Sequence, residues 1–196
     1  MPSLSPGLQL LASAVRYALA SAGLVTPLLL SHPTPCAEWD LEALLGHVGD
    51  SAGVLHQAIT SGCVGLGPPP GGDPPGDDPP GLDPVRGLYR QTTRLLATCA
   101  AAGPARQLAA VGDRELTTGM VALAGAVEIT VHGWDISVAC GAPRPVPTGL
   151  AAILLPLAPL LITPATRPGL FADPVQVPAE ASLGDQLVAF LGRQPR

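Results

Sequence analysis

The sequence predicts an all-α protein, a four-helix bundle followed by a Pro-rich C-terminal extension with a final short helix. Hydrophobic residues make up 47% of the 196-residue chain and charged residues only 13%, so the chain can bury a sizeable core. Four long segments have helical character, and a single long connection separates the second from the third. No segment shows convincing strand alternation, although Gln176 and its flanking valines could form a short extended piece.

The first two helices are expected over residues 7–22 and 40–60. In each, apolar residues recur at steps of three and four, which places them along one helical face. Asp40 can cap the second helix, and Glu42 suits the positive end of its dipole. The apolar stripe of this second helix consists of Leu41, Leu44, Leu45, Val48, Ala52, Leu55 and Ile59.

A Pro/Gly-rich segment over residues 65–84 follows, and we expect a long surface loop there because proline is excluded from helix interiors. The third helix is expected over residues 83–102. The fourth is expected over 117–140, ending at Gly141 as a C′ residue. Because this fourth helix is apolar nearly all round, it should be buried on several sides.

The segment after Gly141 is rich in proline. Its apolar stretch over residues 150–162 is interrupted by Pro156 and Pro159, and a last helix is expected near 181–191. We therefore expect one domain over residues 1–196, with an appendage over about 142–196.

Composition argues against several classes of function. The net charge is −5 and all ten basic residues are arginine, so no basic patch for a nucleic acid is expected. The N-terminus lacks a basic n-region, and the longest apolar run is too short to span a bilayer, which predicts a cytoplasmic protein without a membrane. There is no G-x-S-x-G, Walker A or dinucleotide motif, so nucleophilic hydrolase, NTPase and dehydrogenase functions have no support.

Glu128 and His132 are the most informative residues. They are four apart in an apolar segment, so on a helix both side chains leave the same face. A carboxylate in such surroundings is costly to bury without compensation, and no lysine or arginine occurs between Arg114 and Arg144. A divalent metal ion would compensate the charge, with His132 as a second ligand. The alternative is a simple contact within the helix, which this spacing often produces.

His47 is a candidate third ligand, because it lies at the boundary of the apolar stripe on the second helix. With Glu128 and His132 it would complete the two-histidine, one-carboxylate set of an open zinc site. The same ligands suit iron or nickel, so they do not identify the metal. The alternative for His47 alone is a boundary histidine with no ligand role. No catalytic residue is assigned.

Further candidates surround these three positions. Asp135 shares the face of Glu128 and His132, where it could orient a ligand histidine, solvate the helix or provide a fourth metal ligand. Trp134 and Ser51 are candidate pocket residues. Packing is the simplest role for Trp134, as it is for Trp39.

Three segments together resemble a known family: TPCAEWDLEALLGHV at 34–48, VEITVHGWDISVACG at 127–141 and FADPVQVPAEASLGDQLVAFLGRQP at 171–195. The chain is similar to actinobacterial metal-binding proteins related to mycothiol-dependent maleylpyruvate isomerase, in the DinB-like superfamily. The resemblance implies an up-down four-helix bundle with a metal ion in a cleft between helices. It also places His47, Glu128 and His132 at the family's ligand positions.

The resemblance implies a metal-dependent transferase or isomerase that acts on a small organic substrate, with zinc as the expected ion and mycothiol as a candidate cofactor. One alternative is an enzyme of actinobacterial secondary metabolism that needs no thiol and performs cyclisation, isomerisation or C–S chemistry. Another is a non-catalytic module that binds a metal or a small molecule. A homodimer is a candidate assembly.

Overall fold

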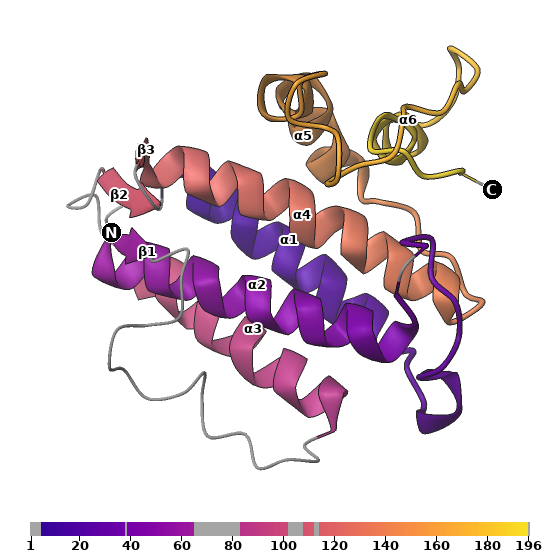
Figure 1. Cartoon of the computed structure of the whole chain (residues 1–196), viewed down its shortest axis with the longest axis horizontal. Helices are drawn as coiled ribbons and strands as arrows, with labels where there is room; N and C mark the ends of the chain where they lie inside the picture. Colours follow the sequence, from indigo (N-terminus) through magenta and orange to yellow (C-terminus); the bar gives the residue numbers. More distant parts are fainter. Residues whose placement is uncertain (1–4, 38, 65–82, 102–107, 112–113, 196) are drawn as a thin grey trace.

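A computed structural model describes residues 5–37, 39–64, 83–101, 108–111 and 114–195. Four long helices form the body of the molecule: α1 (Pro6–Ala22), α2 (Leu41–Ser61), α3 (Pro84–Ala101) and α4 (Thr118–Ala139) (Figure 1). The predicted all-α, DinB-like fold is confirmed, and the expected limits of these four helices agree with the structure to within one residue. Residues 65–82 of the predicted loop lie outside the described residues.

Helices α1 and α4 run in the same direction and touch along their length. Gly7 lies beside Gly119 near their first turns, and Gly133 lies beside Ala18 towards their ends. Helix α2 runs in the opposite direction to α4, because its residue Leu55 packs near the start of α4 whereas the beginning of α2 faces the end of α4.

Helix α3 is parallel to α2. Gly49 lies against Leu88 near their beginnings, and His56 is hydrogen-bonded to Thr98 further along. The four helices thus run up, down, down and up, so the end of α2 and the start of α3 lie at opposite ends of the bundle (Figure 1). A bundle with this order needs a long connection between its second and third helices, where the sequence has its Pro/Gly-rich segment.

Local signals in the sequence define the helix ends. The side chain of Asp40 accepts a hydrogen bond from the Ala43 amide at the start of α2, and Thr117 does the same for Met120 at the start of α4. Helix α2 ends at Gly62, whose φ of 67° is the left-handed conformation that glycine adopts without strain. Gly141, with φ 70°, follows α4 in the same way.

A small three-stranded sheet at one end of the bundle was not predicted. Strand β1 (Cys63–Val64) pairs in parallel with β2 (Leu108–Val111), which pairs in antiparallel fashion with β3 (Arg114–Thr117). These strands have two to four residues, too few for alternating hydrophobicity to be recognised. Gln176, where an extended piece was anticipated, lies in no strand; its neighbour Val175 donates one backbone hydrogen bond to Ala189.

The interrupted apolar stretch is a continuous helix, α5 (Thr148–Leu161), contrary to the prediction of a broken segment. Pro156 and Pro159 lie within it, and both are on its exposed side, where water can reach the carbonyl groups that lose their amide partners. Burial of the opposite side outweighs the cost of the prolines. The buried residues of α5 are Leu150, Ala151, Leu154 and Ala158.

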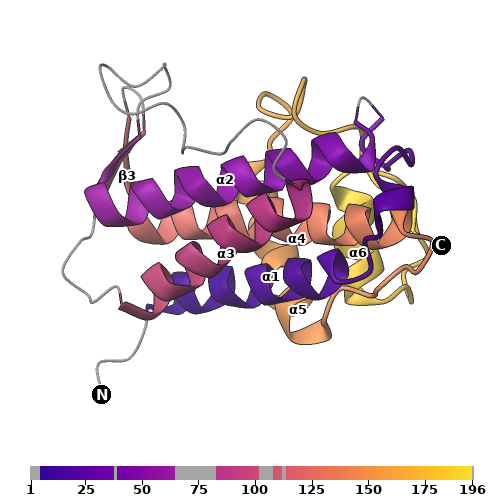
Figure 2. The same cartoon turned by 90° about the horizontal axis from the view of Figure 1, so that it is seen from below.

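The final helix, α6 (Leu183–Phe190), forms as expected, and a short 3-10 helix, η1 (Pro27–Leu29), precedes α2. Helices α5 and α6 lie on the side of the bundle formed by α1 and α4, away from α3 (Figure 1, Figure 2). Their buried side chains belong to the same hydrophobic cluster as those of α1 and α4. The C-terminal extension therefore covers a face of the bundle that would otherwise expose apolar residues.

Helix α4 is the centre of the core. Among the described residues it is the one helix that is long and apolar enough to cross a membrane, and 83% of its most apolar 18-residue stretch is buried inside the protein. The core helix of a soluble protein meets the same criterion, so length and hydropathy do not identify a membrane span here.

We expect the close approach of α1 and α4 at Gly133 to be essential for stability. A Cβ atom there would lie 2.9 Å from the backbone Cα of Ala18, which cannot move without moving α1. The substitution Gly133→Ala should lower the free energy of unfolding by about 1–3 kcal/mol, measured by urea denaturation.

Gly46→Ala is the matched control, because a Cβ at this exposed position of α2 meets nothing within 4 Å. It should raise the free energy of unfolding by up to about 1 kcal/mol through helix propensity. Equal effects of the two substitutions would contradict the assignment of close helix packing to Gly133.

Candidate metal centre

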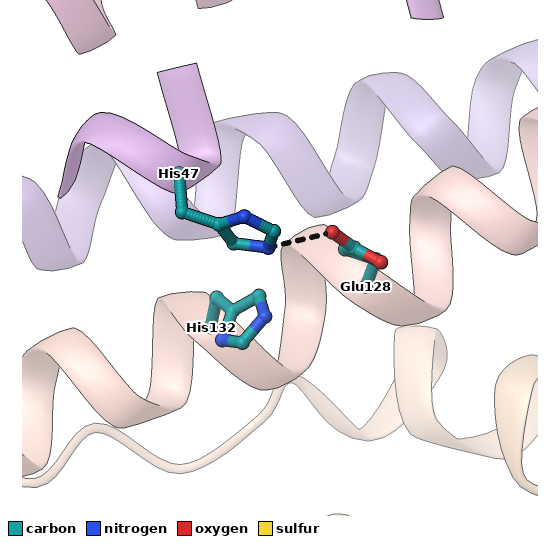
Figure 3. A group of neighbouring side chains, drawn as sticks. All are labelled: His47, Glu128 and His132. Atoms are coloured by element: carbon teal, nitrogen blue, oxygen red, sulfur yellow. Dashed lines mark hydrogen bonds and ion pairs between the residues drawn. The ribbon is translucent and has the colours of Figure 1, made fainter. Parts of the chain in front are cut away.

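Three potential metal ligands meet between α2 and α4. His47 comes from the first half of α2, and Glu128 and His132 come from successive turns of α4, so that all three side chains point towards one another (Figure 3). One ligand atom from each lies within 4.8 Å of the others, and Nε2 of His47 is 3.0 Å from Oε1 of Glu128. Because α2 and α4 cross here, residues that are 81 positions apart in sequence form one group.

The carboxylate of Glu128 is stabilised as an anion. The hydroxyl of Ser51 donates a hydrogen bond of 2.8 Å to the same oxygen that His47 contacts. Burial by itself would raise the pKa of the Glu128 carboxyl, but these hydrogen bonds and the neighbouring His132 outweigh it and lower the pKa to about 2. The side chain keeps 37% of its surface exposed. Glu128 is therefore less deeply buried than its apolar sequence context predicted.

The imidazole of His132 is oriented by a hydrogen bond to a carboxylate. Its Nδ1 lies 3.0 Å from Oδ2 of Asp135, whose side chain is completely buried. The guanidinium of Arg193 binds the same carboxylate through two hydrogen bonds, Nε to Oδ1 at 3.2 Å and Nη2 to Oδ2 at 2.8 Å. Because this carboxylate can only accept, Nδ1 of His132 carries the proton and Nε2 is the nitrogen available to a ligand.

The pair of Asp135 and Arg193 also links the C-terminal segment to the bundle. Arg193 follows α6 and is itself buried, with Nη1 donating to the carbonyl of Leu191. Burial alone would lower the pKa of the guanidinium, but the hydrogen bonds and charge of Asp135 raise it, so the arginine stays charged.

Trp39 lies beside the three candidate ligands. It immediately precedes the N-cap of α2, and its ring centroid is 4.3 Å from that of His47 and 5.9 Å from that of His132. An indole in this position limits the rotation of both imidazoles and shields one side of the group from water. Trp39 thus belongs to the site, whereas packing was the role favoured from sequence.

The donor set fits a divalent metal ion. Two imidazoles and one carboxylate match the protein ligands of open zinc sites, in which water or a substrate takes the fourth position. Bonds of 2.0–2.1 Å in a tetrahedron place ligand atoms roughly 3.3 Å apart; the hydrogen-bonded atoms of His47 and Glu128 are 3.0 Å apart, and all three ligand atoms lie within 4.8 Å of one another. The hydrogen bond between Asp135 and His132 is the arrangement that usually orients a metal-binding histidine.

A groove of about 470 Å³ opens from this group between α2 and α4. His47, Ser51 and Glu128 line one end of it, and Leu116 of β3 belongs to its lining as well. Its remaining lining consists of Asp50, Val54, Leu55, Ala58, Val121, Ala124 and Gly125. A larger cavity of about 760 Å³ lies near Trp134, Cys140 and Arg193, but none of the three candidate ligands lines it.

The structure brings together most of the residues that were singled out from sequence. Ser51 and Asp135 contact Glu128 and His132 directly. Asp135 does not face solvent, because both of its carboxylate oxygens are hydrogen-bonded to protein side chains. For the same reason Asp135 does not provide a fourth metal ligand. Trp134 is buried and lines the other cavity.

Arg193 is the site residue that sequence reasoning missed. It lies three residues after the apolar helix 183–190, within the third of the segments that carry the family resemblance, which assigned it no role in the site. Nothing in the sequence relates that residue to Asp135, which is 58 positions away.

Comparison with known proteins identifies a family and two relatives. The family model described as the mycothiol maleylpyruvate isomerase N-terminal domain matches residues 11–137, which include all three candidate ligands. Uncharacterised proteins from two strains of Mycobacterium tuberculosis, CDC 1551 / Oshkosh and ATCC 25618 / H37Rv, are each 32% identical to the chain, with 85% of this chain and 86% of theirs covered. No solved structure matches the chain significantly.

We expect Arg193→Met to reduce both stability and metal affinity, because it leaves the buried Asp135 carboxylate without its cation. The free energy of unfolding should fall by about 3–5 kcal/mol in urea denaturation. Metal affinity, measured by competition with a chromogenic chelator, should fall about 10–100-fold as His132 loses its fixed orientation.

Arg144→Met is the control, since this side chain is exposed and should change stability by no more than about 0.5 kcal/mol. The double variant Asp135→Leu, Arg193→Met should be more stable than the sum of the single effects predicts, because no unpaired charge remains. Additive effects would show that the two side chains are not energetically coupled.

Proposed function

The chain belongs to the mycothiol maleylpyruvate isomerase N-terminal domain family, and on this premise we propose that it is a metal-dependent enzyme of the thiol transferase or isomerase type, acting on a small organic substrate. The observation that carries the proposal is the convergence of His47, Glu128 and His132, of which His47 and Glu128 line the end of a substrate-sized groove. Zinc is the ion we propose, with nickel and iron as alternatives that the same ligands accept.

Each residue of the site has a defined role in this proposal. His47, Glu128 and His132 would hold the ion, which when bound supplies Lewis acidity and lowers the pKa of a thiol or water. Ser51 fixes one oxygen of Glu128 through its hydrogen bond. Asp135, with Arg193, keeps the proton on Nδ1 of His132 and aims its other nitrogen into the site. Trp39 limits access of water from one side.

The thiol is proposed to come from outside the chain. No cysteine belongs to the candidate metal group among the described residues. Burial raises the pKa of Cys99 to about 11 and also raises that of Cys140, so both thiols stay protonated and are poor nucleophiles at neutral pH. Mycothiol, named in the description of the family, is the thiol we propose as cofactor or co-substrate.

One observation favours a second candidate function. Beyond His47, Ser51 and Glu128 the described lining of the groove is apolar apart from Asp50, whereas a sugar-bearing thiol would need many hydrogen-bonding partners. This supports an enzyme that requires no mycothiol and catalyses an isomerisation, cyclisation or C–S bond reaction. A purely structural metal site has less support, because Asp135 is engaged elsewhere and the described part of the chain places no fourth ligand in the group.

We predict that protein purified without chelators contains about one divalent ion per chain, measured by plasma mass spectrometry. His132→Ala should lower the metal content strongly, and the double variant Glu128→Ala, His132→Ala should abolish it. His56→Ala is the control, because His56 lies on α2 but is bonded to Thr98 and lies outside the group. Metal retained by the double variant would contradict the assignment of these residues as metal ligands.

We also predict that the metal-loaded protein consumes substrate only with a suitable thiol present. Candidate electrophiles and isomerisable acids would be incubated with mycothiol, with cysteine or with no thiol, and products followed by mass spectrometry. Turnover that depends on mycothiol and is lost in His47→Ala supports the first candidate. Equal turnover without any thiol would reject mycothiol dependence and support the second candidate.

A further inference from the structure

The groove that leads to the metal group has an unusual charge pattern for a site in a thiol- or acid-converting enzyme. Among the described residues that line it, the only charged side chains are Asp50 and Glu128, and none is an arginine. The chain has no lysine to supply a cation instead. A carboxylate group on a substrate would therefore find no arginine or lysine along the described wall of the groove, and His47 is assigned to the metal.

The shape of the groove adds a second constraint. Its lining residues on α2 extend from His47 to Ala58, over which an α-helix rises about 16 Å at 1.5 Å per residue. On α4 they extend from Glu128 back to Val121, and Leu116 of β3 adds to the apolar lining. Polar groups are confined to the end that holds the candidate ligands and to Asp50 on the rim.

A smaller apolar space of about 150 Å³ adjoins the same residues on the side of α5. It shares Ala124 and Glu128 with the groove, and the rest of its lining is apolar apart from Thr166. Glu128 therefore borders apolar side chains in two places, in the groove on the α2 side of α4 and in the smaller space on the α5 side.

We propose that the substrate is a neutral molecule with a polar, metal-binding head and an elongated apolar tail, and that the tail lies in the groove between α2 and α4. The proposal rests on the proposed function, because the head is placed at the metal group. A small dicarboxylate is not the substrate in this proposal, since Asp50 would repel its second carboxylate and no arginine or lysine in the described lining would pair with it. Burying the tail would supply binding energy in proportion to its apolar area.

The test uses the protein loaded with cobalt(II), in which binding of a thiolate to the metal produces a charge-transfer absorption band. Neutral alkyl thiols from ethanethiol to hexanethiol are titrated and compared with mercaptohexanoate, which has a carboxylate at the far end of a chain of the same length. Affinity should rise with each methylene, by at most about fourfold. Mercaptohexanoate should bind at least tenfold more weakly than hexanethiol.

Val54→Arg should reverse this preference. Val54 lines the groove, is 48% exposed and is none of the candidate ligands, so an arginine can be accommodated and would place a cation beside the tail. The variant should bind mercaptohexanoate more tightly and hexanethiol more weakly than the natural protein. Leu28→Arg, at an 88% exposed position outside the groove, is the matched control and should change neither affinity.

The outcomes separate this proposal from the proposed function. If ethanethiol gives the band but chain length has no effect and mercaptohexanoate binds as well as hexanethiol, the substrate class is wrong and the metal function stands. If no thiol gives the band although cobalt(II) is bound, activation of a thiol at the metal is rejected, and hexanol is titrated instead while the methyl NMR signals of Val54, Leu55 and Val121 are followed. Shifts confined to these residues would support the apolar site, and their absence would overturn it.

Discussion

The buried pair of Asp135 and Arg193 is the interaction on which the rest of the structure depends. A carboxylate with no exposed surface near the end of the apolar helix α4 would be prohibitively costly alone. Two hydrogen bonds from one guanidinium compensate it in the geometry that arginine forms best with a carboxylate. Because the arginine follows α6, the C-terminal segment must fold back onto α4 before the core is complete.

This pair connects packing to the candidate metal site. The carboxylate that arginine neutralises is also the acceptor for Nδ1 of His132, so the position of the last residues of the chain determines the orientation of an imidazole in the bundle. The α5–α6 segment covers the hydrophobic face of α1 and α4 and, through Arg193, fixes one of the three candidate ligands. Stability and metal affinity should therefore change together when this contact is altered.

The site combines a rigid, polar end with a permissive apolar groove. Hydrogen bonds and aromatic contacts fix the candidate ligands, whereas the described groove wall beyond them offers mainly aliphatic surface. Such a division lets one metal-binding framework serve different substrates, since the groove can change without disturbing the ligands. Membership of the family is therefore informative about the polar end, and the groove of this chain decides what binds there.

The sequence by itself determined the four long helices, the capping positions Asp40 and Gly141, and the placement of Glu128 and His132 on one helical face, because amphipathic periodicity and residue spacing are local properties. His47 became a candidate ligand through the donor set it would complete and through the family resemblance. From the sequence we also expected that a lone carboxylate in α4 needs a compensating charge, and we assigned this need to Glu128. The structure shows that Glu128 is partly exposed, whereas Asp135 is the fully buried carboxylate. Only the tertiary structure showed the direction of α3, the short sheet, the continuous α5 and the role of Arg193. Most of these depend on contacts between residues distant in sequence, such as the pairing of β1 with β2, and in α5 the burial of one face outweighs the local effect of two prolines.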